Sequence, residues 1–589
     1  MTRARLISLV AWASVLVLPL VLDDYHVTIL TYVGLAAVVA LGLVLLTGQA
    51  GLSSFGQAAY VGLGAYITAI LTRSPFGFSP WLTLPIVLMV AAAGSYLGAL
   101  ITVRLSGHYL SLATIAFAIS AYFLAGALQI TGGQSGLSDI PPLSLFQLEL
   151  KQPWHLYVLV GLLFFLAMQA LDNLLDSRMG RAIRAVSGSQ AMAEASGIDT
   201  RGVKVAVFVI ACVLAALAGW IYAHFQRFIN PTPFSLSQGI EYLFMAVVGG
   251  AASLWGAIIG SGLVILLKQW LQSVLPGIVG HGGNFEIVVF GVLVIALFQF
   301  APDGLTPRLA RLFGLAGITP RTYPKVPPLP LRAKNAPGTA LVEIRKACKT
   351  FGGVIANKDV DLDLRAGEVV AVIGPNGAGK STLFNLMTRV IDPDSGTFSF
   401  CGKSIDRMAA RLIAQAGISR TFQHVRLLPK MSVIENVAIG AHARAKKNMI
   451  SAMLRRDRYE EAQILAEAHG QVMRVGLGDY AWNEAGALAL GQQRLVEIAR
   501  ALAADPHALL LDEPAAGLRH KEKQALGELL AALKAEGIGI LLVEHDMDFV
   551  MKLADRIIVL DYGEVLAVGT PAEIRADPRV HEAYLGGVE

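Results

Sequence analysis

The clearest chemistry in the chain lies in the stretch GPNGAGKST at 374–382. Its three glycines allow backbone N–H groups to curl around phosphate oxygens, and a helix beginning there adds partial positive charge. An apolar, β-branched run precedes the stretch and a helical pattern, KSTLFNLMTRV, follows it. Lys380 is expected to reach the β- and γ-phosphates of a nucleotide, and the Ser381 hydroxyl to bind Mg²⁺. The predicted phosphate-binding loop consists of Gly374, Pro375, Asn376, Gly377, Ala378, Gly379, Lys380, Ser381 and Thr382.

A pair of carboxylates ends the run HALLLDEP at 507–514. Three leucines before them predict a short buried strand. Asp512 is expected to bind Mg²⁺, directly or through water. Glu513 is placed to take a proton from a water molecule that attacks the γ-phosphoryl group. The two carboxylates are therefore the predicted metal ligand and the predicted general base.

Three further side chains fall in order around these two motifs. Gln423, in GISRTFQHVRLLP, could touch Mg²⁺ with its amide, and His545, after the apolar run IGILLVEH, could contact the γ-phosphate. Phe351, in KTFGGV, could stack on adenine. Each alone is more often structural, but their order along the chain favours the functional interpretation.

The elements that would position these residues occupy only the second half of the chain. Of 589 residues, 54% are hydrophobic and 15% charged, and residues 1–316 hold 11 of the 43 acidic side chains. This imbalance predicts a membrane domain at 1–316 followed by a soluble domain. The membrane domain is expected to be all-α, and the strand–loop–helix motif indicates an α/β fold for the soluble domain at 339–589. The net charge of +5 gives little support for nucleic-acid binding. The cysteines at 212, 348 and 401 lack the spacing of a metal site.

Apolar runs long enough to span, or nearly span, a bilayer recur throughout the first half. Gly249 and Gly250 are expected to break the stretch 238–272 into a short helix and a longer one. The pattern predicts about ten spans, with eight as the alternative, and the first run is interpreted as a helix rather than a signal peptide. Apart from the stretch 238–272, the apolar runs lie at 6–22, 27–47, 51–72, 81–103, 109–130, 155–175, 203–225 and 285–300.

Basic residues favour one orientation of these spans. They gather before the first run, in the loop 178–204 and after the last run, whereas the loop 131–153 carries only Lys151. The positive-inside rule therefore places both termini and the soluble domain in the cytoplasm. The loop 178–204 is amphipathic, with Gly197 placed to end a short helix, and is expected to dock on the soluble domain.

Two features inside the membrane half left alternatives open. The segment 47–66, rich in glycine and small polar residues, suits either close helix packing or a broken helix beside a substrate path. Glu241 begins a hydrophobic run. A carboxylate there costs free energy unless it has an ionic partner or contacts water. A position at the membrane interface was favoured over a substrate contact. Residues 317–338, with six prolines and several basic residues, are predicted to form an extended cytoplasmic linker.

Residues 341–589 resemble an ATP-binding cassette along nearly their whole length, because the motifs above occur in the order of that superfamily. GPNGAGKSTLFN, RTFQHVRLLPKMSVIENV, GQQRLVEIARAL and DEPAAGL resemble the ATPases of branched-chain amino acid importers. In the first half, RLSGHYLSLATIAFA, TGGQSGLSDIP and AVVGGAASLWGAIIG resemble the permeases of the same importers. The resemblance implies a fused permease and ATPase of the bacterial inner membrane, with ATP and Mg²⁺ as cofactors.

The resemblance also implies partners. Two cassettes sandwich two ATP molecules, and an extracytoplasmic solute-binding protein delivers the solute. The chain is expected to join a second permease and a second ATPase, or to self-associate as a homodimer. Urea, amides and aromatic acids are alternative solutes. An exporter and a regulatory ATP-binding module that does not transport are alternative functions.

The cassette signature departs from the pattern of the superfamily. In place of Leu-Ser-x-Gly-Gln the chain has Leu488, Ala489, Leu490, Gly491 and Gln492, so the hydroxyl that grips the neighbouring cassette's γ-phosphate is missing. Arg519 also replaces the Asp or Asn common after AAGL. Both departures lie on the face offered to the partner cassette. They predict an asymmetric pair of ATP sites.

Overall fold

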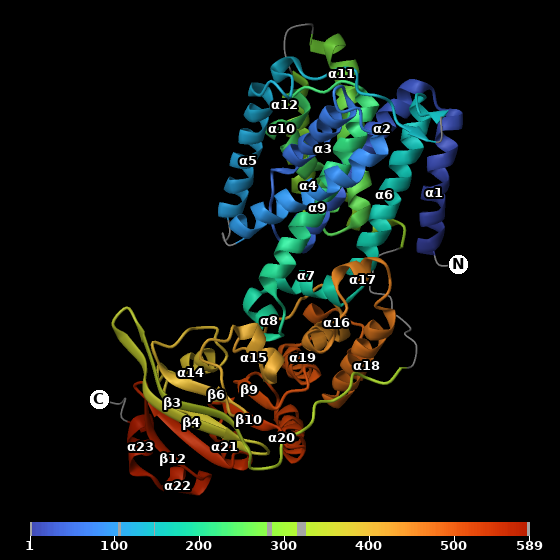
Figure 1. Cartoon of the computed structure of the whole chain (residues 1–589). Helices are drawn as coiled ribbons and strands as arrows, with labels where there is room; N and C mark the ends of the chain where they lie inside the picture. The colour runs from blue at the N-terminus through green and yellow to red at the C-terminus, as the bar shows by residue number, and fades with distance from the viewer. Residues whose placement is uncertain (1–2, 104–107, 146–147, 280–284, 315–325, 586–589) are drawn as a thin grey trace. The chain divides into compact units, whose positions relative to one another are not determined.

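The computed structural model describes residues 3–103, 108–145, 148–279, 285–314 and 326–585. The chain divides into two compact units, each treated by itself (Figure 1). The first unit comprises Met1–Asp176 and Arg201–Gly317, and the second comprises Ser177–Thr200 and Ile318–Glu589. The segment Ser177–Thr200 therefore belongs to the second unit, although it lies within the sequence of the first.

Helices dominate the first unit, and one lies at each of the ten predicted apolar segments. Within the described residues, six segments are long and apolar enough to cross a membrane: Asp24–Gln49, Pro80–Thr102, Tyr109–Ala127, Pro153–Leu175, Thr200–Gln226 and Leu254–Val274. A short helix, α13 (Leu305–Leu312), follows them. The ten are α1 (Arg3–Val21), α2 (Asp24–Leu43), α3 (Gln57–Thr72), α4 (Pro80–Thr102), α5 (His108–Ala127), α6 (Pro153–Leu175), α9 (Thr200–Gln226), α10 (Leu236–Gly250), α11 (Leu254–Val279) and α12 (Phe285–Phe300).

Two of the apolar segments are interrupted, and the interruptions lie against each other. The helix α2 continues into a π-helical turn, η1 (Val44–Gln49), and the chain is not helical at 51–56. The helix α10 ends at Gly250, whose φ of +117° suits glycine. A Cβ on Gly48 would lie 1.6 Å from the carbonyl oxygen of Ala251. The segment 47–66 thus contains a break in the helix and a close packing contact. Its position beside a substrate path remains a prediction.

The segment 177–200 forms two short helices, α7 (Arg178–Gly188) and α8 (Gln190–Ala195). The hydroxyl of Ser177 caps α7 by accepting from the backbone N–H groups of Met179 and Gly180. Gly197 follows α8 with a φ of +78°, so the predicted glycine end of a short helix is confirmed.

Two sheets form the frame of the second unit. The larger has the strand order β12-β11-β5-β10-β9-β8 and is parallel except at β12; the smaller, β4-β3-β6-β7, is antiparallel. The larger consists of β5 (Val369–Ile373), β8 (Ile418–Arg420), β9 (Ala508–Asp512), β10 (Gly539–Val543), β11 (Arg556–Asp561) and β12 (Glu564–Gly569), and the smaller of β3 (Ala340–Phe351), β4 (Val354–Arg365), β6 (Ser395–Phe400) and β7 (Lys403–Ser404).

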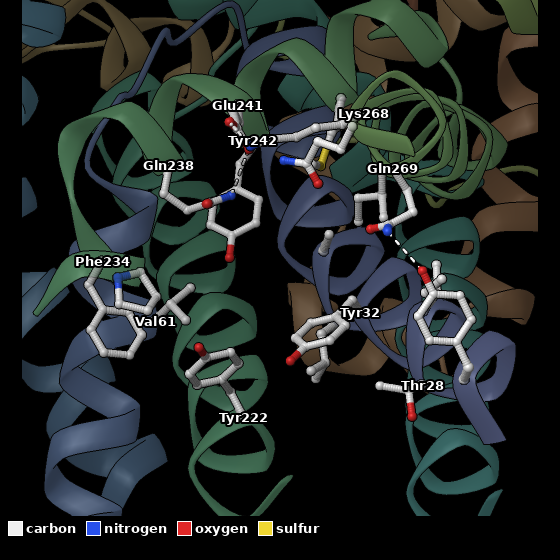
Figure 2. Close-up of a pocket in the computed structure, with 18 residues that line it drawn as sticks. Thr28, Tyr32, Val61, Tyr222, Phe234, Gln238, Glu241, Tyr242, Lys268 and Gln269 are labelled. Atoms are coloured by element: carbon white, nitrogen blue, oxygen red, sulfur yellow. Dashed lines mark hydrogen bonds and ion pairs between the residues drawn. The ribbon is translucent and has the colours of Figure 1, made fainter. Parts of the chain in front are cut away.

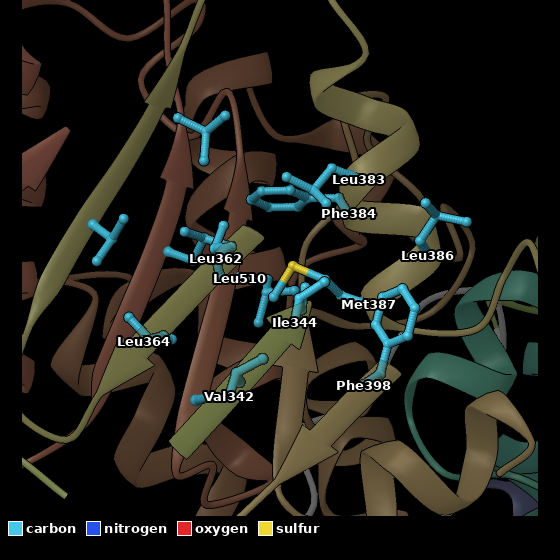
Figure 3. Close-up of a cluster of buried hydrophobic side chains, with 14 of the residues drawn as sticks. Val342, Ile344, Leu362, Leu364, Leu383, Phe384, Leu386, Met387, Phe398 and Leu510 are labelled. Carbon is cyan, nitrogen blue, oxygen red and sulfur yellow. The ribbon is translucent and has the colours of Figure 1, made fainter. Parts of the chain in front are cut away.

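Every residue of β5, β9 and β10 is buried, because both faces of the larger sheet are covered. On one face, Val342 and Ile344 of the smaller sheet pack with Phe384 and Met387 (Figure 3). A separate hydrophobic cluster joins α16, α18 and α19. The helices are α14 (Lys380–Met387), α15 (Ala410–Ala416), α16 (Val433–Gly440), α17 (Met449–Met453), α18 (Arg458–Arg474), α19 (Leu490–Ala503), α20 (His520–Ala535), α21 (Met547–Leu553), α22 (Pro571–Ala576) and α23 (Pro578–Leu585).

The second part of the predicted linker packs within the second unit. Residues 315–325 lie outside the described residues, and 326–338 form no helix or strand. Leu329 is buried in the cluster of α16, α18 and α19, and the Lys334 ammonium lies 3.0 Å from the Asp505 carboxylate. This part of the proline-rich segment is therefore held on the second unit.

Candidate nucleotide site

The glycine-rich loop connects the carboxyl end of β5 to α14. Gly374, Gly377 and Gly379 have φ values of +152°, +88° and +92°. A Cβ on Gly374 would lie 2.0 Å from the carbonyl oxygen of Leu560, and one on Gly379 would lie 2.1 Å from that of Ala356. Only glycine fits at these two positions. Pro375, Asn376 and Ala378 lie in the loop between these glycines, and Thr382 lies in the first turn of α14.

Lys380 begins α14 and folds back into the loop. Its ammonium donates to the carbonyl oxygens of Gly374 (2.7 Å) and Pro375 (2.8 Å). Burial lowers the pKa of Lys380, while the carboxylates of Glu513 and Asp512 oppose that shift. The neighbouring Ser381 side chain is exposed. The Lys380 ammonium therefore lies inside the loop in which the sequence predicts a bound phosphate.

Asp512 ends β9 as a buried carboxylate. Its backbone N–H donates to the hydroxyl of Thr421 at 3.1 Å, but its Oδ1 has no hydrogen-bond partner among the described residues. Burial raises the pKa of Asp512, and Arg420 acts in the opposite direction. A buried carboxylate oxygen without a partner suits a hard divalent cation. The residues present therefore fit the predicted Mg²⁺ site.

The three predicted catalytic side chains meet at one carboxylate oxygen. Glu513 Oε1 lies 3.0 Å from the amide nitrogen of Gln423 and 3.1 Å from Nε2 of His545. Glu513 has a φ of +49°, in the left-handed region, and its N–H donates to the carbonyl of Val543. Its side chain is 19% exposed and that of His545 is 45% exposed, so water reaches both.

Glu544 was missed by the sequence analysis. Its buried carboxylate accepts from the backbone N–H groups of Ala515 (2.5 Å) and His545 (3.1 Å). Burial raises its pKa. The residue thus ties the loop after Glu513 to the segment that carries His545. Its position at the end of an apolar run is the one signal in the sequence, and this signal does not distinguish Glu544 from a structural carboxylate.

Phe351 ends β3 and its ring is 44% exposed. The ammonium of Lys349 lies 5.4 Å from the ring centroid. An accessible aromatic face is compatible with stacking on a base. Phe351 is not part of the cluster around Glu513.

Ala489 occupies the N-cap position of α19. The alanine has extended backbone (φ −61°, ψ 152°) and no side-chain acceptor for the free N–H groups of the first turn. The second contact of a capping box, from the N-cap backbone to the side chain three residues on, is present: the Oε1 of Gln492 accepts from the Ala489 N–H at 3.2 Å. Gly491 is buried and lies close to Leu518, whereas Leu488 is buried in the cluster of α16, α18 and α19. The cap retains one of its two usual contacts.

The helices α7 and α8 are bound to the rest of the second unit by charged contacts. Arg181 forms a bidentate pair with Glu461 of α18, with N–O distances of 2.5 and 3.0 Å. The two side chains are only 4% and 3% exposed. Arg178 donates to the carbonyl oxygen of His442 at 2.7 Å. The loop 178–204 therefore contributes a buried ion pair to this unit.

The segment after Gln423 lies between α8 and α19. Arg426 donates to the Ser189 hydroxyl at 2.9 Å, and its backbone N–H donates to Glu497 at 2.8 Å. Arg494 of α19 donates to the carbonyl oxygen of Gln423 at 3.1 Å. A continuous set of contacts thus links the α7–α8 junction, the signature helix and the carboxylate of Glu513.

Known families match both halves of the chain. Residues 25–297 match the branched-chain amino acid transport system permease component. Residues 357–516 match the ABC transporter family. Residues 564–589 match the family of branched-chain amino acid ATP-binding cassette transporters.

Curated relatives match the second half over 249 residues, or 42% of this chain and 98% of each relative. The high-affinity branched-chain amino acid transport ATP-binding protein LivG is 44% identical in Salmonella typhimurium and 43% in Escherichia coli, and BraF of Pseudomonas aeruginosa is 40% identical. A solved nucleotide-free cassette of an ABC transporter is 31% identical over 42% of this chain and 98% of its own, with a TM-score of 0.38.

These matches define the class of protein. The apolar helices and the permease family indicate a membrane protein with a cytoplasmic ATPase. The cassette binds nucleotide, and hydrolysis by such ATPases is coupled to transport. A transporter of this kind works with a solute-binding protein and with partner subunits or a second copy. The chain belongs to the branched-chain amino acid ABC transporter family, as a permease component and an ATP-binding protein joined in one polypeptide.

Proposed function

We propose that the chain imports branched-chain or other apolar amino acids across the bacterial inner membrane. The convergence of Gln423 and His545 on Glu513, in a chain that also carries a permease region, is the observation that supports an active transport ATPase best. The proposed domains are the permease at 1–316, the linker at 317–338 and the cassette at 339–589. Both termini and the cassette face the cytoplasm.

Glu513 acts as the general base in this proposal. Water attacks the γ-phosphorus, the bond to the leaving ADP oxygen breaks, and the Glu513 carboxylate accepts the proton of the water. Gln423 and His545 orient that carboxylate and the water, while Lys380 leaves its loop carbonyls to pair with phosphate oxygens. Ser381, Asp512 and Gln423 would hold Mg²⁺, which when bound would neutralise phosphate charge. Phe351 stacks on adenine.

Transport is coupled to hydrolysis through α7 and α8. These helices lie within the permease sequence, yet their contacts are with the cassette fold of the second unit. Arg426 joins Ser189 to the segment that begins at Gln423. A shift of Gln423 on nucleotide binding or hydrolysis therefore reaches the α7–α8 junction through the backbone 423–426 and the contact of Arg426 with Ser189.

The signature Leu488–Gln492 completes the ATP site of a partner cassette. We propose that this partner is a second ATPase with its own permease, because the family resemblance favours two different halves; a homodimer is the second candidate. An extracytoplasmic binding protein delivers the solute. The compact α7–α8 pair favours import over export, since exporters extend long helices into the cytoplasm. The intact Lys380, Asp512, Glu513 and His545 disfavour a regulatory module that does not transport.

Uptake by the purified complex tests the proposal. The chain and its co-purifying subunits are reconstituted in liposomes that enclose ATP, with the solute-binding protein outside. Accumulation of labelled L-leucine is expected, and it should require both enclosed ATP and the binding protein. Accumulation of urea, an amide or an aromatic acid instead would replace the substrate assignment. Outward transport that is independent of the binding protein would establish export.

The substitution Glu513→Gln is expected to abolish uptake and slow hydrolysis by about 10²- to 10⁴-fold, because the amide cannot accept the proton. Binding of ATP should persist, since Lys380 and the loop are unchanged. Glu528→Gln, the same change on the exposed side of α20, is the matched control. Unchanged leucine uptake in Glu513→Gln would remove the general-base assignment.

A further inference from the structure

The first unit contains a cavity of about 380 Å³, a size within the range of small-molecule sites. It lies among α2, α3, α9, α10 and α11, next to the short turn η3 (Thr232–Phe234) (Figure 2). Six lining residues enter the argument below: Tyr32, Tyr222, Phe234, Gln238, Glu241 and Lys268.

A charge pair lies at one end of this cavity. The Lys268 ammonium is 2.7 Å from Glu241 Oε1, and the Gln238 amide lies 3.3 Å from the other carboxylate oxygen. Lys268 is the fifteenth residue of α11, a helix within the candidate spans, and is far from either helix end. Ionisable residues in such positions are costly and are usually retained for function. The side chains of Lys268 and Glu241 are 40% and 23% exposed, so a solute in the cavity can reach both.

Aromatic rings line the cavity away from the charge pair. Figure 2 shows the rings of Tyr32 and Tyr222 on the far side of the cavity from Glu241 and Lys268. The Tyr222 ring lies 5.7 Å from that of Phe234 in an edge-to-face arrangement. The Phe234 side chain in turn packs against Gly62, where a Cβ would approach it to 3.0 Å. The rings therefore form an aromatic wall opposite two charges.

We propose that this cavity is a binding site of the permease for a zwitterionic amino acid with an apolar side chain. Glu241 accepts hydrogen bonds from the α-ammonium group, Lys268 donates to the α-carboxylate, and the side chain lies against Tyr32, Tyr222 and Phe234. The solute separates the existing ion pair and gives each member a new partner. This assignment names the solute site of the proposed importer and rests on that function.

Net charge explains why a zwitterion fits this cavity better than an amine, a carboxylic acid or an amide does. The Glu241–Lys268 pair is neutral overall, so a neutral zwitterion leaves no charge unpaired in an environment of low dielectric constant. An amine or a carboxylic acid of the same shape leaves one member of the pair without a partner. Urea and simple amides lack the charges that would separate the pair. The cavity therefore favours amino acids over the alternative solutes of the family.

Competition binding on the unmodified complex tests the charge argument without any substitution. The probe is labelled L-leucine, bound to the purified complex in nanodiscs without the binding protein. Unlabelled L-leucine is expected to compete at least about tenfold better than isoamylamine or 4-methylpentanoate, which each lack one charged group. Equal competition by the three compounds would overturn the proposal.

Substitutions locate the site. The double variant Glu241→Gln/Lys268→Met removes both charges, so that neither residue is left as a charge without its partner. Its KM for L-leucine uptake is expected to rise about tenfold or more. The single variants should change selectivity: Glu241→Gln towards 4-methylpentanoate and Lys268→Met towards isoamylamine. The matched control is Glu149→Gln, which removes an exposed carboxylate that pairs with Lys151 in the same unit.

The outcomes separate this inference from the proposed function. Leucine uptake by the wild type with an unchanged KM in the double variant would overturn the cavity assignment and leave the importer intact. A wild type that accumulates urea and no amino acid would overturn both. Loss of affinity in the double variant, with Glu149→Gln like the wild type, supports the assignment.

Discussion

Asp512 is a buried carboxyl group at the end of β9, beside Glu513, the proposed general base. One of its oxygens has no hydrogen-bond partner in the described part of the chain. Burial raises the pKa of Asp512, so the folded chain favours the neutral acid more than the unfolded chain does. Ionisation of Asp512 therefore lowers stability above the folded-state pKa. This loss of stability disappears as the pH falls through that pKa.

The substitution Asp512→Asn is expected to raise the apparent melting temperature of the nucleotide-free chain at pH 7, by a stabilisation of about 1–3 kcal/mol. The gain should shrink towards acidic pH, and Mg²⁺-dependent ATP binding should weaken. Fluorescence-detected thermal unfolding of the full chain measures both trends.

Asp394→Asn is the control of opposite sign, because a hydrogen bond from Lys349 lowers the pKa of the Asp394 carboxyl. That variant should show no gain at pH 7. A lower melting temperature in Asp512→Asn would show that the carboxylate is stabilised by contacts other than those described.

The missing N-cap hydroxyl at Ala489 predicts a gain of activity. In Ala489→Ser the new hydroxyl can satisfy a free N–H group of α19 and, in the closed dimer, donate to the neighbouring γ-phosphate. A hydrogen bond to a charged group contributes about 1.5–3 kcal/mol, so hydrolysis or the lifetime of the ATP-bound dimer should rise about tenfold.

The control for this substitution is Ala487→Ser, two residues earlier and also exposed, which introduces the same hydroxyl away from the N-cap. Both variants are compared by steady-state hydrolysis and by size-exclusion of the Glu513→Gln background with ATP. Equal behaviour of the two variants would show that the missing hydroxyl has no part in the closed dimer.

At the scale of elements, a buried ion pair helps to attach α7 to the second unit. Breaking Arg181–Glu461 by Arg181→Glu places two carboxylates together in a buried site, a destabilisation of about 3–5 kcal/mol or more. Leucine uptake should be lost while ATP binding persists. The charge exchange Arg181→Glu/Glu461→Arg is expected to restore part of the uptake.

Lys358→Glu is the matched control for that reversal of charge, because Lys358 pairs with Glu564 at the exposed surface of the cassette. An exposed pair is screened by water, so uptake should stay near the wild-type rate. Full uptake by Arg181→Glu would show that α7 does not transmit the cassette's motion.

At the scale of the whole molecule, the altered signature predicts two unequal ATP sites if the partner ATPase carries a complete signature. The site built on Lys380 and Glu513 is then closed by the partner, whereas the opposite site is closed by Ala489. Glu513→Gln should abolish uptake, and the corresponding change in the partner should reduce it far less. Native mass spectrometry of the purified complex establishes which subunits are present.

A homodimer gives a different expectation. Both sites then share Ala489, so turnover should be low and Ala489→Ser should raise it for both sites together. Equal losses from the two general-base substitutions in a heteromeric complex would contradict the asymmetric arrangement.

The sequence by itself determined the chemistry and the order of the parts. The phosphate-binding loop, the two carboxylates and the signature are recognised from local patterns. Each depends on residues that are neighbours in the sequence, through glycine conformation, strand burial and helix capping. The ten apolar segments and the break at Gly249–Gly250 were predicted on the same basis. Hydropathy could not show how many of the helices cross the membrane, since α3, α10 and α12 are shorter than the six candidate spans.

Only the tertiary structure decided which distant residues meet. Gln423, Glu513 and His545 lie up to 122 residues apart, and the order of the parallel strands places them at one edge of the sheet. Glu241 was interpreted as an interfacial carboxylate because its partner, Lys268, lies on another helix. Pairing between elements depends on packing geometry rather than on local pattern, and this is why the charge pair in the cavity could be found only in the folded chain.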